Sequence, residues 1–389
     1  MDMIFHTPDL PSKYLQVIER IEGLRRELGW ATSDRLNRWQ GQLARTTLAR
    51  AVQGSNAIEG INVTLDDAVA AMDGEKPQVR DEADRFALTG YWRAMTFVLQ
   101  KAKEKDYVYN EHDLKSLHYM MVEHDLSAYP GRWRPGGVHI TNTTTNKVVY
   151  EAPDIEIVPE LVRELVEYLN APDAKAPQIV RAAMAHLNLA MIHPFKDGNG
   201  RMARVLQSLV LMREGVVAPE FSCIEEYIGD HPGDYYKVLG DVGQGRWHPE
   251  RDALPWIRFC LTAHHQQAMT LLRRIAEAIK TWDALEAAVK AKGLNPRVVP
   301  ALSDAAANLR VTNPSYRKQA ELTNQVAKID LKNLVLAGFL EAKGEKRGRY
   351  YVAADPVIKI REAVRLPREP ADPFADEEPK LPVLPIGTL

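Results

Sequence analysis

The chain of 389 residues is short of cysteine and of long apolar runs, and both shortages exclude classes of protein. Its two cysteines, Cys223 and Cys260, are too few for a disulfide framework or a zinc site, so we expect both to be reduced. No apolar run reaches the length that crosses a bilayer, and the first residues lack the charged-then-apolar pattern of a secretion signal. We therefore expect a cytoplasmic protein with no membrane partner.

The chain also lacks a strong excess of charge of either sign. Its formal net charge is -2, which argues against a general role on nucleic acid or on a membrane surface. A hydrophobic content of 45% and a mean hydropathy of -0.32 are typical of a soluble globular protein. The length is sufficient for two or three domains.

The most informative stretch is residues 193–204, His-Pro-Phe-Lys-Asp-Gly-Asn-Gly-Arg-Met-Ala-Arg. Apolar residues at helical spacing precede it from Pro177 onward, and a second such run follows from Arg201. Because Pro194 disfavours helical geometry at the residue before it, the first helix should end near His193. The pattern predicts two helices joined by a tight, glycine-containing loop.

Such a loop can bind a polyphosphate. Successive backbone N–H groups at a helix N-terminus attract anions, and Arg201 and Arg204 share one face of the second helix, where both can fork onto phosphate oxygens. Asp197 is a natural ligand for phosphate-bound Mg²⁺, and His193 can take a proton from an incoming hydroxyl. An ordinary interhelical turn would explain any one of these residues, but not the complete set.

At this point the chain resembles the Fic family, because residues 193–204 match the signature HPFxDGNGRxxR at every fixed position. Flanking matches extend the resemblance: His186 lies seven residues before His193, and 131–134 is similar to the segment G-x-Y/W-R that precedes the family's flap. Residues 226–259 resemble the downstream helices. The resemblance covers roughly residues 10 to 355.

The resemblance implies a mainly α fold, with a helical Fic core and a short β-hairpin flap, and the activity of a protein adenylyltransferase. Fic enzymes move AMP from ATP to a Ser, Thr or Tyr hydroxyl of a target protein and release pyrophosphate. Carried over to this chain, His193 is the general base, Phe195 is the buried anchor of the loop, and Asp197 binds Mg²⁺. The further ATP-binding positions are Gly198, Asn199 and Gly200 in the anion hole, Arg201 and Arg204 on the terminal phosphates, and the tyrosine pair Tyr235 and Tyr236. Core packing is the alternative for the tyrosines.

Residues 55–60, Ser-Asn-Ala-Ile-Glu-Gly, match the family's inhibitory motif (S/T)xxxE(G/N). Ser55 and Glu59 are four residues apart and so share one face of a helix, which Gly60 is suited to end. The resemblance implies that Glu59 pairs with Arg204 and turns the α-phosphate of ATP away from attack. A plain helix end is the alternative interpretation.

Residues 138–151 predict two short strands around a polar turn, 141–146. In Fic proteins the equivalent flap registers the target by strand addition. Its apolar docking residues here would be Val138, Ile140, Val149 and Tyr150. A structural hairpin without a partner is the alternative.

The chain is predicted to have five parts. They are an N-terminal helical region (1–110, with Trp30 and Trp39 as packing residues), the Fic core (111–265), a connector helix (266–290), a winged helix (291–355) and a Pro-rich tail (356–389). Within the winged helix we expect helices over 314–322 and 324–337, the second capped by Thr323, and a hairpin over 338–352.

The winged helix has a basic excess, with nine Lys or Arg against four acidic residues between Arg310 and Tyr351. That charge could meet a DNA backbone, and the alternatives are dimerisation or target binding. Three further functions stay open: transfer of another group, removal of AMP at the same site, and a DNA-binding regulator whose Fic core only senses nucleotide. Modification of the chain by itself and a homodimer also stay open.

Overall fold

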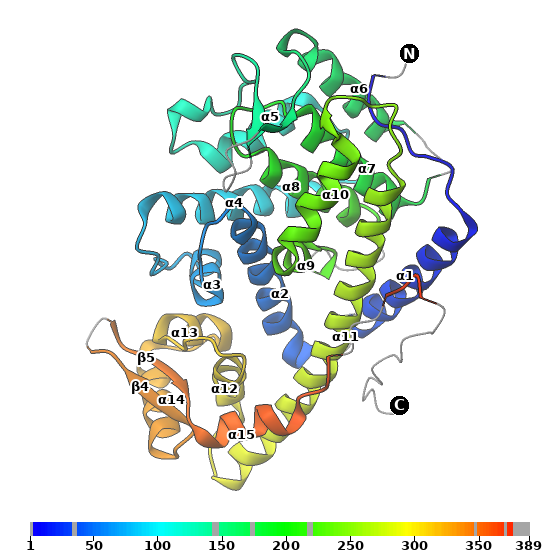
Figure 1. Ribbon diagram of the computed structural model, residues 1–389. Coiled ribbons are helices and arrows are strands. Elements are labelled where there is room, and N and C mark those ends of the chain that lie inside the picture. The colour runs from blue at the N-terminus through cyan, green and yellow to red at the C-terminus, as the bar shows by residue number, and fades with distance from the viewer. Residues whose placement is uncertain are drawn as a thin grey trace. The chain divides into compact units, whose positions relative to one another are not determined.

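The computed structural model describes residues 3–32, 37–141, 148–171, 176–215, 221–345, 348–368 and 372–375. The chain divides into two compact units. Unit 1 comprises Met1–Gly29, Leu48–Ala268 and Ala371–Glu378, and unit 2 comprises Trp30–Thr47, Met269–Pro370 and Pro379–Leu389. Helices predominate in both, so the expected mainly α fold is confirmed (Figure 1). Within the described ranges, every helix is too short or too polar to cross a bilayer.

Unit 1 holds the helices on either side of the loop at 193–198, together with parts of three helices that continue into unit 2. Those three are α1 (Ser12–Ala31), α2 (Asn37–Ile58) and α11 (Leu254–Ala291). The helices wholly within unit 1 are α3 (Leu65–Asp73), α4 (Glu82–Lys101), α5 (Glu111–Val122), α6 (Val158–Asn170), α7 (Gln178–Ile192), α8 (Asn199–Met212), α9 (Glu225–Asp230) and α10 (Pro232–Gly243). Short 3₁₀ turns cover Leu126–Ala128 and Ile155–Ile157.

The core of unit 1 is the pair α7 and α8, which pack side by side (Figure 1). In α7 only Gln178, Arg181 and Ala190 escape burial, and in α8 only Gly200 does. A helix that is buried on all sides must be covered by neighbours, and α4, α5 and α6 supply that cover. The loop between α7 and α8 therefore starts and ends on rigid, fully enclosed helices.

The predicted hairpin is present as β1 (His139–Thr141) and β2 (Val148–Glu151), which pair antiparallel. A third strand, β3 (Gly245–Arg246), pairs parallel with β2 and was not foreseen from the sequence. The sheet order β1-β2-β3 leaves β1 as an edge. Most of the expected turn, residues 142–147, lies outside the described residues.

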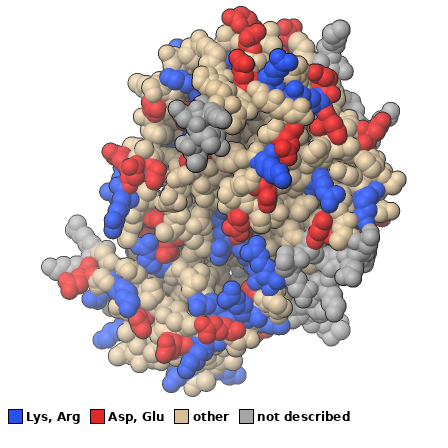
Figure 2. Space-filling model, viewed as in Figure 1, with Lys and Arg blue, Asp and Glu red and all other residues tan. Residues whose placement is uncertain are grey.

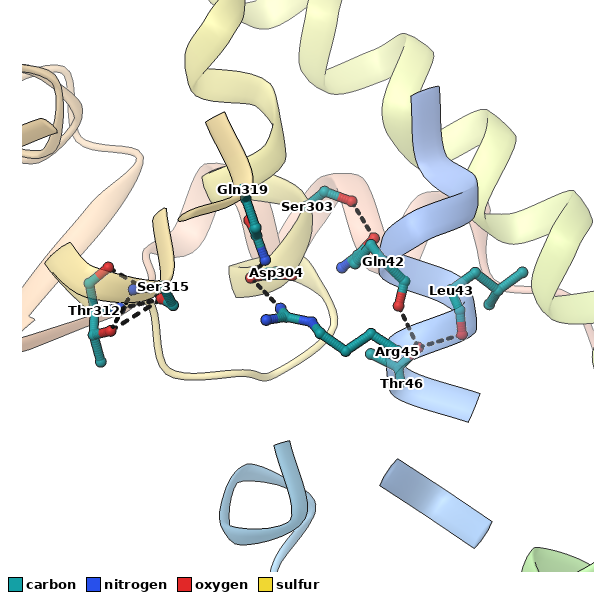
Figure 3. Close-up of polar contacts among 9 residues, drawn as sticks. All are labelled: Gln42, Leu43, Arg45, Thr46, Ser303, Asp304, Thr312, Ser315 and Gln319. Carbon is teal, nitrogen blue, oxygen red and sulfur yellow. Dashed lines mark hydrogen bonds and ion pairs between the residues drawn. The ribbon is translucent and has the colours of Figure 1, made fainter. Parts of the chain in front are cut away.

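Unit 2 contains the predicted pair of helices and hairpin. Thr323 caps α14 (Asn324–Leu336), which follows α13 (Asn313–Ala320), and the two helices precede the antiparallel strands β4 (Leu340–Lys343) and β5 (Tyr350–Ala353). A 3₁₀ turn (Pro296–Val298), α12 (Val299–Ala306) and α15 (Asp355–Val364) complete the unit. At the start of α13, Thr312 and Ser315 form a capping box (Figure 3).

The first half of α2 belongs to unit 2, where it is bonded to α12 (Figure 3). Arg45 Nη2 lies 2.5 Å from Asp304 Oδ2, and Gln319 Nε2 donates to the same oxygen at 2.7 Å. Ser303 Oγ donates to Gln42 Oε1 at 2.5 Å. Helix α2, which has the predicted inhibitory motif at its C-terminal end, thus starts within unit 2.

Two element boundaries and the burial of one side chain differ from the sequence-based prediction. The connector helix begins at Leu254 rather than 266, since Asp252 Oδ1 accepts the Leu254 N–H at 2.9 Å and starts the helix there. The tail begins later than 356, because Pro356 fits the first turn of α15 and Val357 is buried. Trp30 is 57% exposed, so its predicted packing role is wrong, and the side chain of Trp39 lies outside the described residues.

Candidate active site

The loop between α7 and α8 is a sharp turn with left-handed backbone at both ends. His193 ends α7 with φ 52°, and Gly198 precedes α8 with φ 77°. A glycine tolerates that conformation at no steric cost, whereas an added Cβ at Gly198 would also meet Val122 Cγ1 at 3.4 Å. Because Gly198 has no side chain to cap α8, the first N–H groups of the helix remain available to an anion.

Phe195 anchors the loop, as the resemblance implied. Its ring is fully buried and stacks on His118, with ring centroids 3.9 Å apart. Asn199 holds its backbone at both ends: the Phe195 N–H donates to Asn199 Oδ1 at 2.9 Å, and Asn199 Nδ2 donates to the Phe195 carbonyl at 2.8 Å. Asn199 therefore shapes the loop with its side chain, and contact of Asn199 with ATP stays a prediction.

Arg134 holds the other side of the loop, and the sequence reasoning did not include it among the site residues. Its side chain is 2% exposed, and Nε donates to the His193 carbonyl at 3.0 Å. The Arg134 N–H donates to the Pro194 carbonyl at 2.9 Å, and Nη1 donates to Gly136 O at 2.6 Å. The match of 131–134 to a family segment was the only signal in the sequence. A buried arginine that bonds carbonyls is visible only after folding.

His193 is arranged as a base. Its Nδ1 lies 3.1 Å from the Ala190 carbonyl, and since a carbonyl only accepts, Nδ1 carries the proton and Nε2 keeps its lone pair. Burial lowers the pKa of His193, with a further lowering by Arg134, although the Ala190 bond opposes this. The imidazole is therefore neutral near neutral pH and ready to accept a proton.

Arg201 lies in the first turn of α8 with unused hydrogen-bond donors. Its Nη2 is 3.3 Å from Asp197 Oδ2, while its buried Nε and Nη1 atoms have no hydrogen-bond partner among the described residues. A buried donor without a partner is costly, and a bound anion would supply the missing acceptors. Phosphate binding by Arg201 stays a prediction.

Asp197 is the predicted magnesium ligand, and its side chain is 66% exposed. The described residues contain no cluster of three or more His, Cys, Asp or Glu that could hold a metal. A single open carboxylate next to a phosphate site nevertheless fits Mg²⁺, which is usually bound through one or two carboxylates, substrate phosphates and water. Magnesium binding by Asp197 stays a prediction.

Arg204 is 1% exposed and is held by Ser55 and Glu59 of the predicted inhibitory motif. Its Nη2 lies 2.6 Å from Glu59 Oε1, its Nε donates to Ser55 Oγ at 2.8 Å, and Nη2 also reaches the Ser55 carbonyl at 3.0 Å. Burial opposes the charge, yet Glu59 raises the pKa of Arg204 above its usual value. The structure thus brings together the two motifs, which lie 145 residues apart.

Glu59 directly follows the last residue of α2. The helix ends at Ile58 and Gly60 follows with φ 76°, and the side chains of Ser55 and Glu59, four residues apart, both contact Arg204. Gly200 leaves room for the carboxylate, because a Cβ there would lie 2.5 Å from Glu59 Oε1. Gly54 allows α2 to approach α9 closely, since its Cβ would lie 2.4 Å from Glu225 O.

The two tyrosines differ in environment. Tyr235 is 2% exposed and its hydroxyl lies 3.0 Å from His186 Nε2, while His186 Nδ1 lies 2.6 Å from Gln207 Oε1. Burial lowers the pKa of His186 to about 3, so this ring is a neutral link. Tyr236 is 51% exposed and donates to the Ile58 carbonyl at 3.1 Å. Nucleotide contact by the pair stays a prediction.

The flap presents two of its four expected docking side chains. Ile140 and Val149 are exposed, whereas Val138 is half-buried and precedes β1. Tyr150 is buried and donates to the Met191 carbonyl at 2.9 Å, so its side chain anchors the flap instead of facing a target. Since β2 is paired on both sides, β1 is the strand with an edge open to addition.

Comparison with known proteins decides the family of this region. Residues 108–211 match the family model described as the Fic/DOC family. This part of the chain is a Fic domain. The match covers α5 through most of α8, and with them the flap strands β1 and β2 and the loop that carries His193.

Curated relatives of the Fic domain are called protein adenylyltransferases. The chain is 34% identical over 150 residues to protein adenylyltransferase fic-1 of Caenorhabditis briggsae, covering 38% of this chain and 25% of that protein. It is 29% identical over 215 residues to protein adenylyltransferase Fic of Nematostella vectensis, covering 53% of this chain and 44% of that protein. The chain therefore spans less than half of the length of these relatives.

Solved structures support the fold of the Fic domain and its surroundings. A Fic family protein from Desulfovibrio desulfuricans G20 superposes with a TM-score of 0.58 at 21% identity, covering 90% of this chain and 99% of that one. Fic-1 (residues 134–508) from C. elegans superposes with a TM-score of 0.55 at 22% identity, covering 67% and 72%. At these identities the likeness concerns the fold alone.

Proposed function

We propose that this protein is an adenylyltransferase that moves AMP from ATP to a Ser, Thr or Tyr hydroxyl of a target protein and is inhibited by its own Glu59. The observation that carries the proposal is the ion pair between Glu59 and Arg204 beside a neutral His193. The named relatives support the same chemistry.

The proposed reaction uses the loop residues in turn. The terminal phosphates of ATP lie at the N-terminus of α8, where Arg201 has unused donors and Arg204 becomes available once Glu59 leaves. Asp197 would hold Mg²⁺, which supplies charge neutralisation to the phosphates. His193 Nε2 takes the proton of the target hydroxyl, whose oxygen attacks the α-phosphorus. The bond from that phosphorus to the bridging oxygen breaks, and pyrophosphate leaves.

Inhibition follows from competition for one cation. Glu59 and the terminal phosphate both need Arg204, which is buried and so strongly favours an anionic partner. With Glu59 in place, ATP can bind only with its phosphates displaced from Arg204. Glu59 has 29% of its side chain exposed, so it is the partner that can withdraw.

The test uses ATP labelled at the α-phosphate, with Mg²⁺ and with cell lysate as a source of targets. We expect label on protein with Glu59→Gly, little with wild type, and none with Glu59→Gly/His193→Ala. Glu104→Gly is the matched control, because it removes an exposed carboxylate that pairs with Lys101 and also follows a helix. Its labelling should equal that of wild type.

Two results would overturn the proposal. Absence of α-label from every variant, with label from γ-labelled ATP instead, would show phosphate transfer. Equal labelling by wild type and Glu59→Gly would remove the inhibitory role. Removal of AMP, the further alternative, is tested by incubating labelled product with wild-type protein and measuring released AMP.

The C-terminal unit fits a winged helix, which we include in the proposal. Its exposed residues on α14 support two kinds of partner: Lys328 and Lys332 suit a phosphate backbone, whereas Ile329 and Leu336 suit a protein surface. On the face drawn in Figure 2, basic and acidic side chains are interspersed rather than gathered into one basic field. We therefore favour a protein partner. A DNA shift with steep salt dependence would favour the regulator alternative.

A further inference from the structure

A second carboxylate, separate from the inhibitory motif, is bonded to the residue one turn after Arg204 on α8. Ser208 follows Arg204 by one turn on α8, so the two side chains share a face of that helix. Ser208 Oγ donates to Glu225 Oε1 at 2.6 Å, and the Tyr91 hydroxyl donates to the same oxygen at 3.3 Å. Glu225 is 1% exposed. The serine that holds this buried carboxylate thus lies one helical turn from a residue with a buried guanidinium.

Glu225 is held independently of Glu59. It is the first residue of α9, and its carbonyl oxygen is in close contact with the backbone of α2 at Gly54. Neither Ser208 nor Tyr91 belongs to the inhibitory motif. Withdrawal of the Glu59 side chain therefore leaves the Glu225 carboxylate where it is.

Arg204 and Glu225 each have a hydrogen-bonding atom that the described residues do not use. Arg204 Nη1 and Glu225 Oε2 are buried and have no hydrogen-bond partner among those residues. Burial of a charge without compensation is unfavourable, and burial of two opposite charges near each other is much less so. Burial raises the pKa of Glu225, and the hydrogen bond from Ser208 and the positive charge of Arg204 offset that rise only in part.

The need for such a group arises when inhibition ends. Once Glu59 leaves, Arg204 keeps its contacts to Ser55 but loses the carboxylate that compensated its charge. A buried guanidinium without a counter-charge would turn toward water or collect a stray anion. For productive binding it has to stay in position until the terminal phosphate arrives.

We propose that Glu225 is a positioning residue that serves as the permanent counter-ion of Arg204 and keeps it directed at the terminal phosphate of ATP after Glu59 withdraws. This inference rests on the proposed function, since it assigns a role within the same site. Glu225 acts through Arg204 and does not itself touch the nucleotide.

The experiment measures the dissociation constant of Mg²⁺–ATP by calorimetry in four proteins, all carrying His193→Ala to prevent turnover. They combine Glu59 or Glu59→Gly with Glu225 or Glu225→Gln. Glutamine preserves the shape of Glu225 and can still accept from Ser208, but it carries no charge. We expect Glu225→Gln to weaken binding by about tenfold or more with Gly at 59, and by less than about twofold with Glu59 present, because there Glu59 compensates Arg204.

Glu226→Gln is the matched control, because Glu226 is the next residue of α9 and accepts a hydrogen bond from Gln267 at 3.1 Å. It should leave both dissociation constants unchanged. A purely structural role for Glu225 would lower the melting temperature in both backgrounds by the same amount and weaken binding equally in both. That equal effect would overturn the inference.

Two further outcomes separate failure of this inference from failure of the proposed function. If the Glu59→Gly parent binds ATP and transfers AMP with His193 restored, but Glu225→Gln changes nothing, the inference fails and the proposed function stands. If that parent does not bind ATP, both fail. Should Glu225→Gln not fold, Ser208→Ala replaces it, because loss of the 2.6 Å bond releases the Glu225 carboxylate. An unchanged ATP affinity in that variant would also overturn the inference.

Discussion

Two arginine–carboxylate pairs, one in each unit, use the same chemistry in opposite ways. In unit 2, Arg297 makes two bonds of 2.8 Å to the two oxygens of Asp330, and Tyr316 donates to Asp330 Oδ2 at 3.0 Å. There the carboxylate is buried and the arginine is 41% exposed. In unit 1 the arginine, Arg204, is buried, and the carboxylate of Glu59 is 29% exposed.

This difference in burial indicates which member of each pair another ion can replace. At Asp330 both carboxylate oxygens accept hydrogen bonds from Arg297 or Tyr316. The pair therefore has a structural role and does not need a ligand. At Arg204 the cation is fixed, one nitrogen has no hydrogen-bond partner within the described part of the chain, and the anion comes from a turn. A fixed cation with a replaceable anion is what a phosphate site with a built-in competitor requires.

The largest difference between the two pairs should appear in the transfer rate when each arginine is replaced. In a Glu59→Gly background, Arg204→Ala should lower AMP transfer by about a hundredfold or more, as for loss of a preorganised charge-stabilising donor. Arg297→Ala should leave the transfer rate unchanged, because its partner lies within unit 2. Transfer rates with α-labelled ATP check both. Comparable rates for Arg204→Ala and its parent would refute the phosphate role.

Acidification should lower the rate of AMP transfer through protonation of His193. Because burial holds the pKa of His193 below its usual 6.5, the base stays neutral at pH 6.5 and loses function only at lower pH. Below that lowered pKa, transfer by Glu59→Gly should fall by about tenfold per pH unit. The measurement is the rate as a function of pH. An acid limb centred above 6.5 would contradict the assigned base.

A smaller effect should come from the contact that positions the inhibitory helix. Gly54→Ala inserts a Cβ 2.4 Å from Glu225 O, so α2 must shift and weaken the Glu59–Arg204 pair. Basal transfer should rise by about threefold to tenfold in an otherwise wild-type chain. Gly41→Ala, in the same helix with nothing within 4 Å of the added Cβ, is the control and should leave transfer unchanged. Equal rates for both variants would mean that the close contact has no role in inhibition.

The least effect on transfer is expected from Asp330→Ala. This variant removes a structural pair whose arginine is partly exposed, so we expect a loss of about 1–2 kcal/mol in the free energy of unfolding. Thermal or urea denaturation measures the loss, and the transfer rate at low temperature, measured in a Glu59→Gly background, should match that of Glu59→Gly alone. A drop in transfer without a drop in stability would show that unit 2 contributes to the reaction.

Much of the site was predictable because its signals are local. The order of residues 193–204 predicted the end of α7 and the tight loop, which the structure has, and a second helix from Arg201, which begins two residues earlier at Asn199. The same holds in unit 2 for the cap at Thr323 and the hairpin. Short spacings determine helix faces and helix ends, so no knowledge of distant residues was needed.

Other features could not be predicted, because they depend on residues far apart in the chain. The pairing of β3 with β2, the inward position of Tyr150 and the bonds of Arg134 around His193 all join distant segments. The sequence alone treated Tyr235 and Tyr236 as a pair, whereas folding buried one and left the other half exposed.

The order of residues determined which groups this protein has for the proposed chemistry: His193, Arg201, Arg204, Asp197 and Glu59. The tertiary structure decided what each group experiences. Burial makes Arg204 dependent on an anion and keeps His193 neutral, and folding brings Glu59 to Arg204 across 145 residues of sequence. Residue order determines identity and local geometry, whereas desolvation and long-range charge arise only when distant segments exclude water together.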